Sequence, residues 1–312
     1  MKYHIYKFHF STALHIGNGS LTDGESMVCA DTLFSGLCHE AVKYSGQACI
    51  DSLVQDTRGG KLLFSDMLPF ISDELYIPKP LNPVKTEQEG DSVQKKKFKK
   101  LKFIPVQKID TYFAGNLDPE IETNKFKSLG SFDLRTMSSS LDPEKSLTGD
   151  MLPFSVGTYK FGANNGLYII AAFTDSETEN QFDLLLTNLS YSGIGGKRSS
   201  GFGRYTFEKM PVPDAVLSKL KNAGSNVITL STSMAKPEEL EGVISDANYL
   251  LVKRSGFVSS DTYAGTLQRK KDFYSFKAGS CFKKYFEGDV FDVSDGGSHP
   301  VYRYAKPLFM EV

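Results

Sequence analysis

The sequence predicts an α+β fold in two domains. Three observations support this: short runs that alternate apolar and polar residues, segments with apolar residues at helical spacing, and a Pro-Val-Pro linker at 211–213 between two such sets. A length of 312 residues also fits two domains. Apolar residues make up 40% and charged residues 23% of the chain, which excludes a wholly disordered or fibrous protein.

The first predicted domain, residues 1–210, begins with a strand and a helix. Alternation over 2–10 indicates the strand, and a loop with His15 and Gly17 follows it. Asp31 is a suitable N-cap for the helix, and Gly46 stands near its expected end. The helix is indicated by apolar residues at i, i+3, i+4, i+7 and i+8: Phe34, Leu37, Cys38, Ala41 and Val42.

The same domain closes with two strands, a helix and a last strand. Residues 154–161 and 167–173 read as strands joined by a hairpin turn at 164–166, because Asn and Gly tolerate positive φ. A helix over 177–189 and a strand over 203–208 follow. The order β-α-β-β-α-β predicts a ferredoxin-like (RRM-like) domain. Residues 47–150 are then an insertion, expected to hold loops, partial order and a projecting hairpin near 132–155.

The second predicted domain, residues 214–312, repeats the pattern less regularly. Strands are expected at 227–232, 249–253, 290–293 and 301–304. A helix is expected after Pro237, with an apolar stripe of Leu240, Val243, Ile244 and Ala247. We interpret this half as a second, irregular ferredoxin-like domain.

Several classes of protein are excluded by pattern. The longest apolar run, 167–173, has seven residues, far short of the ~20 that a membrane helix needs. No apolar secretory segment opens the chain, and the four cysteines lack metal or redox spacing, so we expect a cytoplasmic protein. No carboxylate cluster, zinc ligand set or G-x-S-x-G elbow appears, so we expect no metal, no cofactor and no catalytic residue.

Positive charge clusters although the net charge is only −1. Residues 93–108 contain seven lysines and no acidic residue. Five of the seven arginines lie in the last 115 residues. Such patches suit a phosphate backbone, but a solvated face explains the lysine run equally well.

A glycine-rich loop at 193–204 is the strongest local signal for a binding site. Five glycines in eleven residues allow bare amides to approach phosphate oxygens. Neither the Walker nor the dinucleotide-binding spacing is present, and the expected helix precedes the loop. The alternative is a flexible connection. The predicted ligands are Gly193, Gly195, Gly196, Lys197, Arg198, Ser199, Ser200, Gly201 and Arg204.

Three further sites each allow two interpretations. The Arg254 guanidinium is suited to bind a phosphate, and the Phe257 ring is suited to stack on an RNA base. A place for Phe257 in the hydrophobic core explains it equally well. Arg303 lies between two tyrosines in an expected strand, so its side chain and theirs are on opposite faces. It either binds RNA or, if the strand is at the edge of a sheet, points into solvent. His15, without a positioned partner, makes a structural hydrogen bond or one to RNA.

The loop at 193–204 resembles the glycine-rich loop of the RAMP superfamily of CRISPR proteins. The similarity extends over nearly the whole chain and is most specific for the subunit-four family of type III-A Csm effector complexes. The matching segments are the opening strand at 2–10 and residues 15–17, 30–35, 75–80, 99–105, 191–193, 253–258 and 299–307.

The resemblance implies two ferredoxin-like domains that hold the 5′ handle of CRISPR RNA within a hetero-oligomeric ribonucleoprotein complex, without catalysis. It also implies contacts with the large polymerase/cyclase-like signature subunit and with the backbone RAMP subunit. A thumb is expected at 135–154, which adds Arg135 to the RNA-binding residues, and the family segments at 15–17 and 299–307 add Gly17 and Lys306. One rival is a metal-independent CRISPR RNA-processing endonuclease that relies on His15, and another is a scaffold with negligible RNA contact.

Overall fold

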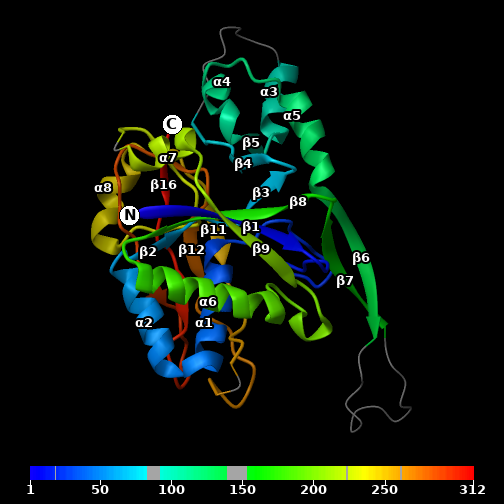
Figure 1. The fold of residues 1–312 in the computed structure, drawn as a ribbon, viewed down its shortest axis with the longest axis vertical. Coiled ribbons are helices and arrows are strands. Elements are labelled where there is room, and N and C mark those ends of the chain that lie inside the picture. Colours follow the sequence, from blue (N-terminus) through cyan, green and yellow to red (C-terminus); the bar gives the residue numbers. More distant parts are fainter. Residues whose placement is uncertain (18, 83–91, 139–152, 223, 261) are drawn as a thin grey trace.

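The computed structural model describes all residues except 18, 83–91, 139–152, 223 and 261. Its centre is a seven-stranded antiparallel sheet in the order β5-β4-β3-β8-β1-β9, with β2 also paired to β8 (Figure 1). The strands are β1 (Lys2–Phe10), β2 (Leu62–Phe64), β3 (Leu68–Ile71), β4 (Glu74–Pro78), β5 (Phe103–Pro105), β8 (Asn165–Phe173) and β9 (Tyr205–Pro211). The described residues are therefore mixed α/β with antiparallel sheets.

Strand β8 is buried on both faces, which explains its unbroken apolar run. Ile169, Ala171 and Phe173 pack into a core with helices α1 (Ala30–Ser45), α2 (Gln47–Arg58) and α6 (Ser176–Ser192). The alternate residues of β8 pack into a second core, shared with helix α7 (Asp214–Lys221) and with strands of the C-terminal half. One strand thus joins the two halves through opposite faces.

The helices expected on one side of the sheet are confirmed. Helix α1 ends at Ser45, and Gly46 follows with φ of 68°, as a glycine after a helix often does. Helix α6 begins after Asp175, whose carboxylate accepts the Thr178 amide at 2.8 Å. Its buried stripe is the expected one: Phe182, Leu185, Leu186 and Leu189.

The expected second strand of the sheet was assigned to the wrong residues. Strand β7 (Pro153–Phe161) pairs with β6 (Gly130–Ser138), whereas β8 pairs with β1, β2 and β3, so 164–166 is not a hairpin turn. Asn164 does take the positive φ of 59°. The strands beside β8 are β2 and β3, which lie inside the segment 47–150 that was expected to be an insertion.

Much of the segment 47–150 is ordered, contrary to expectation. Besides α2 and β2–β5 it holds a helical lobe, at the top of Figure 1, of α3 (Ser92–Lys100), α4 (Ile109–Phe113), α5 (Pro119–Phe126) and the short turns η1 (Val106–Lys108) and η2 (Lys127–Leu129). The projecting hairpin near 132–155 is confirmed as the β6–β7 ribbon, although 139–152 lie outside the described residues.

The C-terminal half builds three small sheets within its described residues. The order β13-β10-β16 forms one sheet, and β11–β12 and β14–β15 are two-stranded. The expected strands and the helix after Pro237 are confirmed, whereas α7, β12, β13 and β16 were missed. The elements are β10 (Val227–Thr229), α8 (Pro237–Ile244), β11 (Leu251–Arg254), β12 (Phe273–Phe276), β13 (Cys281–Phe282), β14 (Val290–Asp292), β15 (Tyr302–Tyr304) and β16 (Phe309–Glu311).

Buried polar groups join the two halves. The Tyr304 hydroxyl accepts the Phe64 amide at 2.9 Å and donates to the Phe64 carbonyl at 3.1 Å, and the two rings stack with centroids 4.2 Å apart. The Asp66 carboxylate accepts the amides of Ala30 and Thr232 and the Thr232 hydroxyl, each at 2.8 Å. Each residue therefore connects segments distant in the sequence.

Replacing Tyr304 by Phe should destabilise the fold. The change leaves the buried amide and carbonyl of Phe64 without their partner, and each such loss costs about 1–3 kcal/mol. Urea unfolding should show a lower midpoint for Tyr304→Phe. The control Tyr274→Phe, at a residue 52% exposed, should leave the midpoint unchanged. Equal midpoints for both variants would contradict the role of Tyr304.

Replacing Asp66 by Asn should remove one component of the pH dependence of stability. Burial raises the pKa of Asp66 to about 6, although its hydrogen-bond donors oppose this. Because the folded pKa lies above the unfolded value of ~3.9, Asp66 stabilises the fold at low pH and loses that contribution between about pH 4 and 6. The difference in unfolding free energy between wild type and Asp66→Asn should therefore change across this interval. A constant difference would contradict the assignment.

Candidate nucleic-acid interface

The glycine-rich loop is fixed against the segment that follows β1. The Gly196 amide donates to the His15 carbonyl at 2.8 Å, and the Gly203 amide donates to the Ala13 carbonyl at 2.9 Å. Gly195 has φ of 91°, and a Cβ there would lie 2.5 Å from the His15 carbonyl oxygen. A flexible connection is therefore the wrong description, because these glycines allow close packing of two chain segments.

One glycine of the loop faces open space instead. Gly201 has φ of 85°, and a Cβ there would have nothing within 4 Å. Near it, Ser199, Ser200 and Arg204 are exposed. This part of the loop, which contains the turn η3 (Arg198–Ser200), is accessible to a ligand backbone.

Two cation–aromatic contacts join the loop to the outer part of the described β6–β7 ribbon. The Lys197 ammonium lies 4.7 Å from the centre of the Phe154 ring. The exposed Arg135 of β6 places its guanidinium 5.4 Å from the centre of the Phe202 ring. The loop and the ribbon are therefore in contact, and we call their cationic and hydroxyl residues, with Gly201, the loop–ribbon surface: Arg135, Lys197, Arg198, Ser199, Ser200, Gly201 and Arg204.

His15 makes a structural hydrogen bond. Its side chain is 5% exposed, and Nδ1 donates to the Gly157 carbonyl of β7 at 2.6 Å. A Cβ on Gly196 would lie 2.6 Å from the His15 ring, so the loop covers this side chain closely. Gly17, two residues later, is exposed. His15 thus connects the β1 loop, the glycine-rich loop and the ribbon.

Asp31 is not the N-cap of α1, contrary to expectation. The N-cap residue is Cys29, and Asp31 lies in the first turn, where its carboxylate is buried between two arginines. Arg254 donates from Nε and Nη2 to both carboxylate oxygens, at 3.0 and 2.8 Å, and Nη1 of Arg303 donates to Oδ2. Burial alone would raise the pKa of Asp31, but the charges of Arg254 and Arg303 hold it below its usual range.

The other expected RNA ligands have varied surroundings. Arg303 is 5% exposed, so its interpretation as a solvent-facing edge residue is wrong. Lys306 is 4% exposed, and its ammonium donates to the Arg58 carbonyl at 3.1 Å. Phe257 is 52% exposed and therefore not a core residue, and the Arg269 guanidinium lies 5.6 Å from its ring centre.

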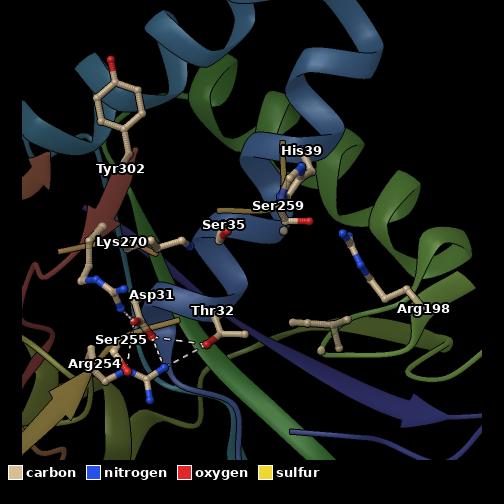
Figure 2. A pocket seen from close by; sticks show the side chains of 14 residues that line it. Asp31, Thr32, Ser35, His39, Arg198, Arg254, Ser255, Ser259, Lys270 and Tyr302 are labelled. Atoms are coloured by element: carbon tan, nitrogen blue, oxygen red, sulfur yellow. Dashed lines mark hydrogen bonds and ion pairs between the residues drawn. The ribbon is translucent and has the colours of Figure 1, made fainter. Parts of the chain in front are cut away.

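A pocket of about 200 Å³ lies between α1, the glycine-rich loop and the C-terminal half. In Figure 2, Asp31, Arg254 and Lys270 lie on one side, Arg198 lies on the other, and Ser35 lies between them. Burial, followed by the charges of Arg198 and Lys270, lowers the pKa of His39 to about 4, so His39 is neutral near pH 7.

Several pocket residues were missed by the sequence analysis: Ser35, His39, Ser255, Ser259 and Lys270. The available signal was the spacing of Ser35 and His39, which places both on one side of α1 away from the core stripe. Nothing in the sequence near Lys270 marks it as a pocket residue. Within the described part of the chain no group of three or more His, Cys, Asp or Glu side chains could hold a metal ion, and no helix is long and apolar enough to cross a membrane.

Two family models match the chain, the RAMP superfamily over residues 7–206 and the CRISPR Csm4 C-terminal domain over residues 222–312. The chain belongs to the Csm4 family of the RAMP superfamily. It is 36% identical to the CRISPR system Cms protein Csm4 of Mycobacterium tuberculosis, over 99% of this chain and 98% of the relative. It is 33% identical to the protein of the same name from Streptococcus thermophilus, over 100% and 99% of the two chains.

Solved structures of the family have the same fold. A chain of the Csm3–Csm4 subcomplex of the type III-A interference complex matches with a TM-score of 0.68, at 18% identity, over 100% of this chain and 99% of that one. A chain of the Csm1–Csm4 cassette in complex with pppApA matches with a TM-score of 0.60, at 16% identity, over 100% and 98%.

Replacing Asp31 by Ala should strongly destabilise the protein. Removing one member of a buried charge cluster leaves the partners uncompensated and costs about 3–5 kcal/mol. Because its folded pKa is depressed, Asp31 stabilises the fold above the unfolded pKa of ~3.9 and loses that contribution as pH falls through the folded value. Chemical unfolding at pH 7 measures the loss. The exposed Asp246→Ala is the control, and an equally small effect of both changes would overturn the account of Asp31.

Proposed function

We propose that this chain is the subunit of a type III-A Csm effector complex that binds the 5′ handle of CRISPR RNA and has no catalytic activity of its own. Family membership and one structural observation support the proposal. That observation is the loop–ribbon surface, where the cationic glycine-rich loop, with its exposed Ser199, Ser200 and Arg204, contacts the ribbon strand that carries the exposed Arg135. Cationic and hydroxyl groups of this kind are suited to an RNA backbone.

The rigid backbone of the loop favours this function. Hydrogen bonds to the β1 segment hold the loop in place before any ligand arrives, so little conformational entropy is lost on binding. The open position at Gly201 lets a strand approach the main chain closely. Contacts of cations and hydroxyls with an RNA backbone position the strand without reading its sequence.

We further infer that the chain forms two ferredoxin-like domains, residues 1–210 and 214–312, the first with an inserted lobe and ribbon. Support for the first domain comes from the strand order β9-β1-β8-β2/β3, in which the fourth, first, third and second strands of such a domain lie side by side. The family matches at 7–206 and 222–312 support the division.

Partner contacts form part of the proposal. Solved complexes named for Csm3–Csm4 and Csm1–Csm4 contain chains of this fold. We propose that this chain likewise contacts the backbone RAMP subunit and the large polymerase/cyclase-like signature subunit. The helical lobe presents exposed lysines of α3 (Lys95, Lys96, Lys99 and Lys100), which suit RNA or an acidic partner face. A nuclease function relying on His15 lacks support, because that side chain is buried and its Nδ1 already donates to a backbone carbonyl.

The combined change of Lys197, Arg198 and Arg204 to Ala should reduce handle binding while the fold persists. Each charged hydrogen bond to phosphate is worth about 1.5–3 kcal/mol, so loss of even one lowers affinity about tenfold or more. The logarithm of the binding constant for single-stranded RNA falls linearly with the logarithm of the salt concentration. Removing three phosphate contacts should make this slope less steep by about 2. The readout is CRISPR RNA affinity of the assembled complex, with circular dichroism of the subunit as a folding check.

A matched control removes three exposed lysines elsewhere: Lys221, Lys277 and Lys284. This variant has the same net charge as the loop variant and should bind the handle like wild type. Equal binding by both variants, with unchanged salt slopes, would show that the loop–ribbon surface is not the RNA site. Repeat-RNA cleavage in EDTA that disappears in His15→Ala would instead favour the nuclease.

A further inference from the structure

Helix α3 of the helical lobe carries positive charge that the loop–ribbon surface does not include. Four of its lysines are exposed, and we call them the lysine face: Lys95, Lys96, Lys99 and Lys100. None of the four ammonium groups makes a hydrogen bond or an ion pair within the part of the chain that the structure describes. Their charge is therefore available to a partner.

The other residues of α3 hold the helix against the lobe. The Phe98 ring packs onto the core with Tyr112 of α4, whose ring centre is 6.3 Å away. The Phe98 carbonyl accepts a hydrogen bond from the Lys79 ammonium at 2.6 Å, and Lys97 forms an ion pair with Glu120 of α5 at 2.6 Å. Because these contacts come from three other segments, the lysine face has a fixed orientation.

The helix keeps these lysines at a cost to its own stability. Lys95 and Lys99 are four residues apart, and so are Lys96 and Lys100, which makes each pair neighbours on the helix surface. Like charges at this spacing destabilise a helix, and the negative end of the helix dipole offsets this only for the lysines of the last turn. An acidic partner relieves this repulsion, so the helix is stabilised when such a partner binds.

The lobe that carries the lysine face lies at the other edge of the central sheet from the end of the glycine-rich loop. Strands β4 and β5, which contact the lobe, are at one edge, and β9, into which the loop leads, is at the opposite edge. Figure 1 shows the lobe, with α3, on the side of β5. Five strand spacings of about 4.8 Å separate the two edges. Contact of RNA with the loop therefore does not require the lysine face.

The composition of this segment favours a protein partner over RNA. Residues 95–102 contain no arginine and no hydroxyl side chain, and their one aromatic ring, Phe98, packs onto the core. RNA sites combine cations with hydroxyl groups and with rings that stack on bases. On α5, which packs against α3, Ile121 is 53% exposed, directly after the Glu120 that Lys97 binds. Charged groups around an apolar contact are typical of protein interfaces.

We propose that the lysine face docks an acidic protein surface, rich in Asp and Glu, of one neighbouring subunit. The inference rests on the proposed contacts with other subunits and specifies one of them by its chemistry. Solved complexes named for Csm3–Csm4 and Csm1–Csm4 contain chains of this fold, so a pair with either subunit is a suitable unit for a test. Because the four ammonium groups are exposed, the contact acts mainly on the association rate and is sensitive to salt.

The test measures association of the chain with the backbone RAMP subunit and, separately, with the large signature subunit, both without RNA. The variant changes Lys95, Lys96, Lys99 and Lys100 to Glu. Association with one of the two subunits should slow about tenfold or more at about 0.1 M salt. The difference should shrink at about 1 M salt, where charges are screened within about 3 Å. Changing the same four lysines to Gln should give a smaller effect of the same kind, and circular dichroism checks that each variant folds.

A matched control changes four exposed lysines elsewhere to Glu: Lys221, Lys271, Lys277 and Lys284. This variant has the same net charge and should associate like wild type. Unchanged association of the lysine-face variant with both subunits, equal slowing of the control, or slowing that persists at high salt would overturn the docking proposal. Weaker binding of CRISPR RNA with unchanged protein association would also overturn it, because the lysine face would then bind RNA. Failure of the wild-type chain to associate with either subunit would instead overturn the proposed partner contacts.

Discussion

The buried carboxylate of Asp31 is the contact on which the arrangement of the two halves depends. It lies in the first turn of α1 and receives hydrogen bonds from Arg254 of β11 and Arg303 of β15. An isolated charge at this depth would be costly, and only the pairing makes it tolerable. The same contact fixes the far wall of the pocket beside the glycine-rich loop, since α1 supplies one side and the strands that carry the arginines supply the other. Asp66 and Tyr304 also join the two halves, through hydrogen bonds to the Thr232 amide and the Phe64 carbonyl, respectively.

The cationic surface is fixed to this framework through close packing of the main chain. The glycine-rich loop packs on the segment after β1, and His15 joins that segment to the ribbon. Three of its glycines, at 193, 195 and 203, take positive φ and lie where a Cβ would meet backbone, whereas Gly201 faces open space. The loop therefore combines a rigid path with one exposed stretch of main chain. Such preorganisation favours a charged ligand because the donors need not be ordered on binding.

The sequence predicted the elements that depend on local pattern and missed those that depend on distant partners. Strand β1 and helices α1, α6 and α8 follow from apolar spacing. The pairing of β7 with β6 could not be predicted in this way, because alternation of apolar and polar residues indicates a strand but not its partner strand. Strands β2 and β3 have only three and four residues, too few for a recognisable alternating pattern. Asp31 has the residue type of a cap, yet its partners lie 223 and 272 residues away. The cationic loop was found because its glycines and charges are contiguous, whereas Lys270 and His39 meet only in the fold.

The central claim is that the loop–ribbon surface contacts the 5′ handle of CRISPR RNA. The most direct measurement is photocrosslinking of the assembled complex with a photoreactive nucleotide in the handle, followed by mapping of the crosslinked peptides. The account predicts crosslinks to the loop at 193–204 and to the ribbon strand that carries Arg135. Crosslinks from the handle to other subunits alone, with none to this chain, would contradict it.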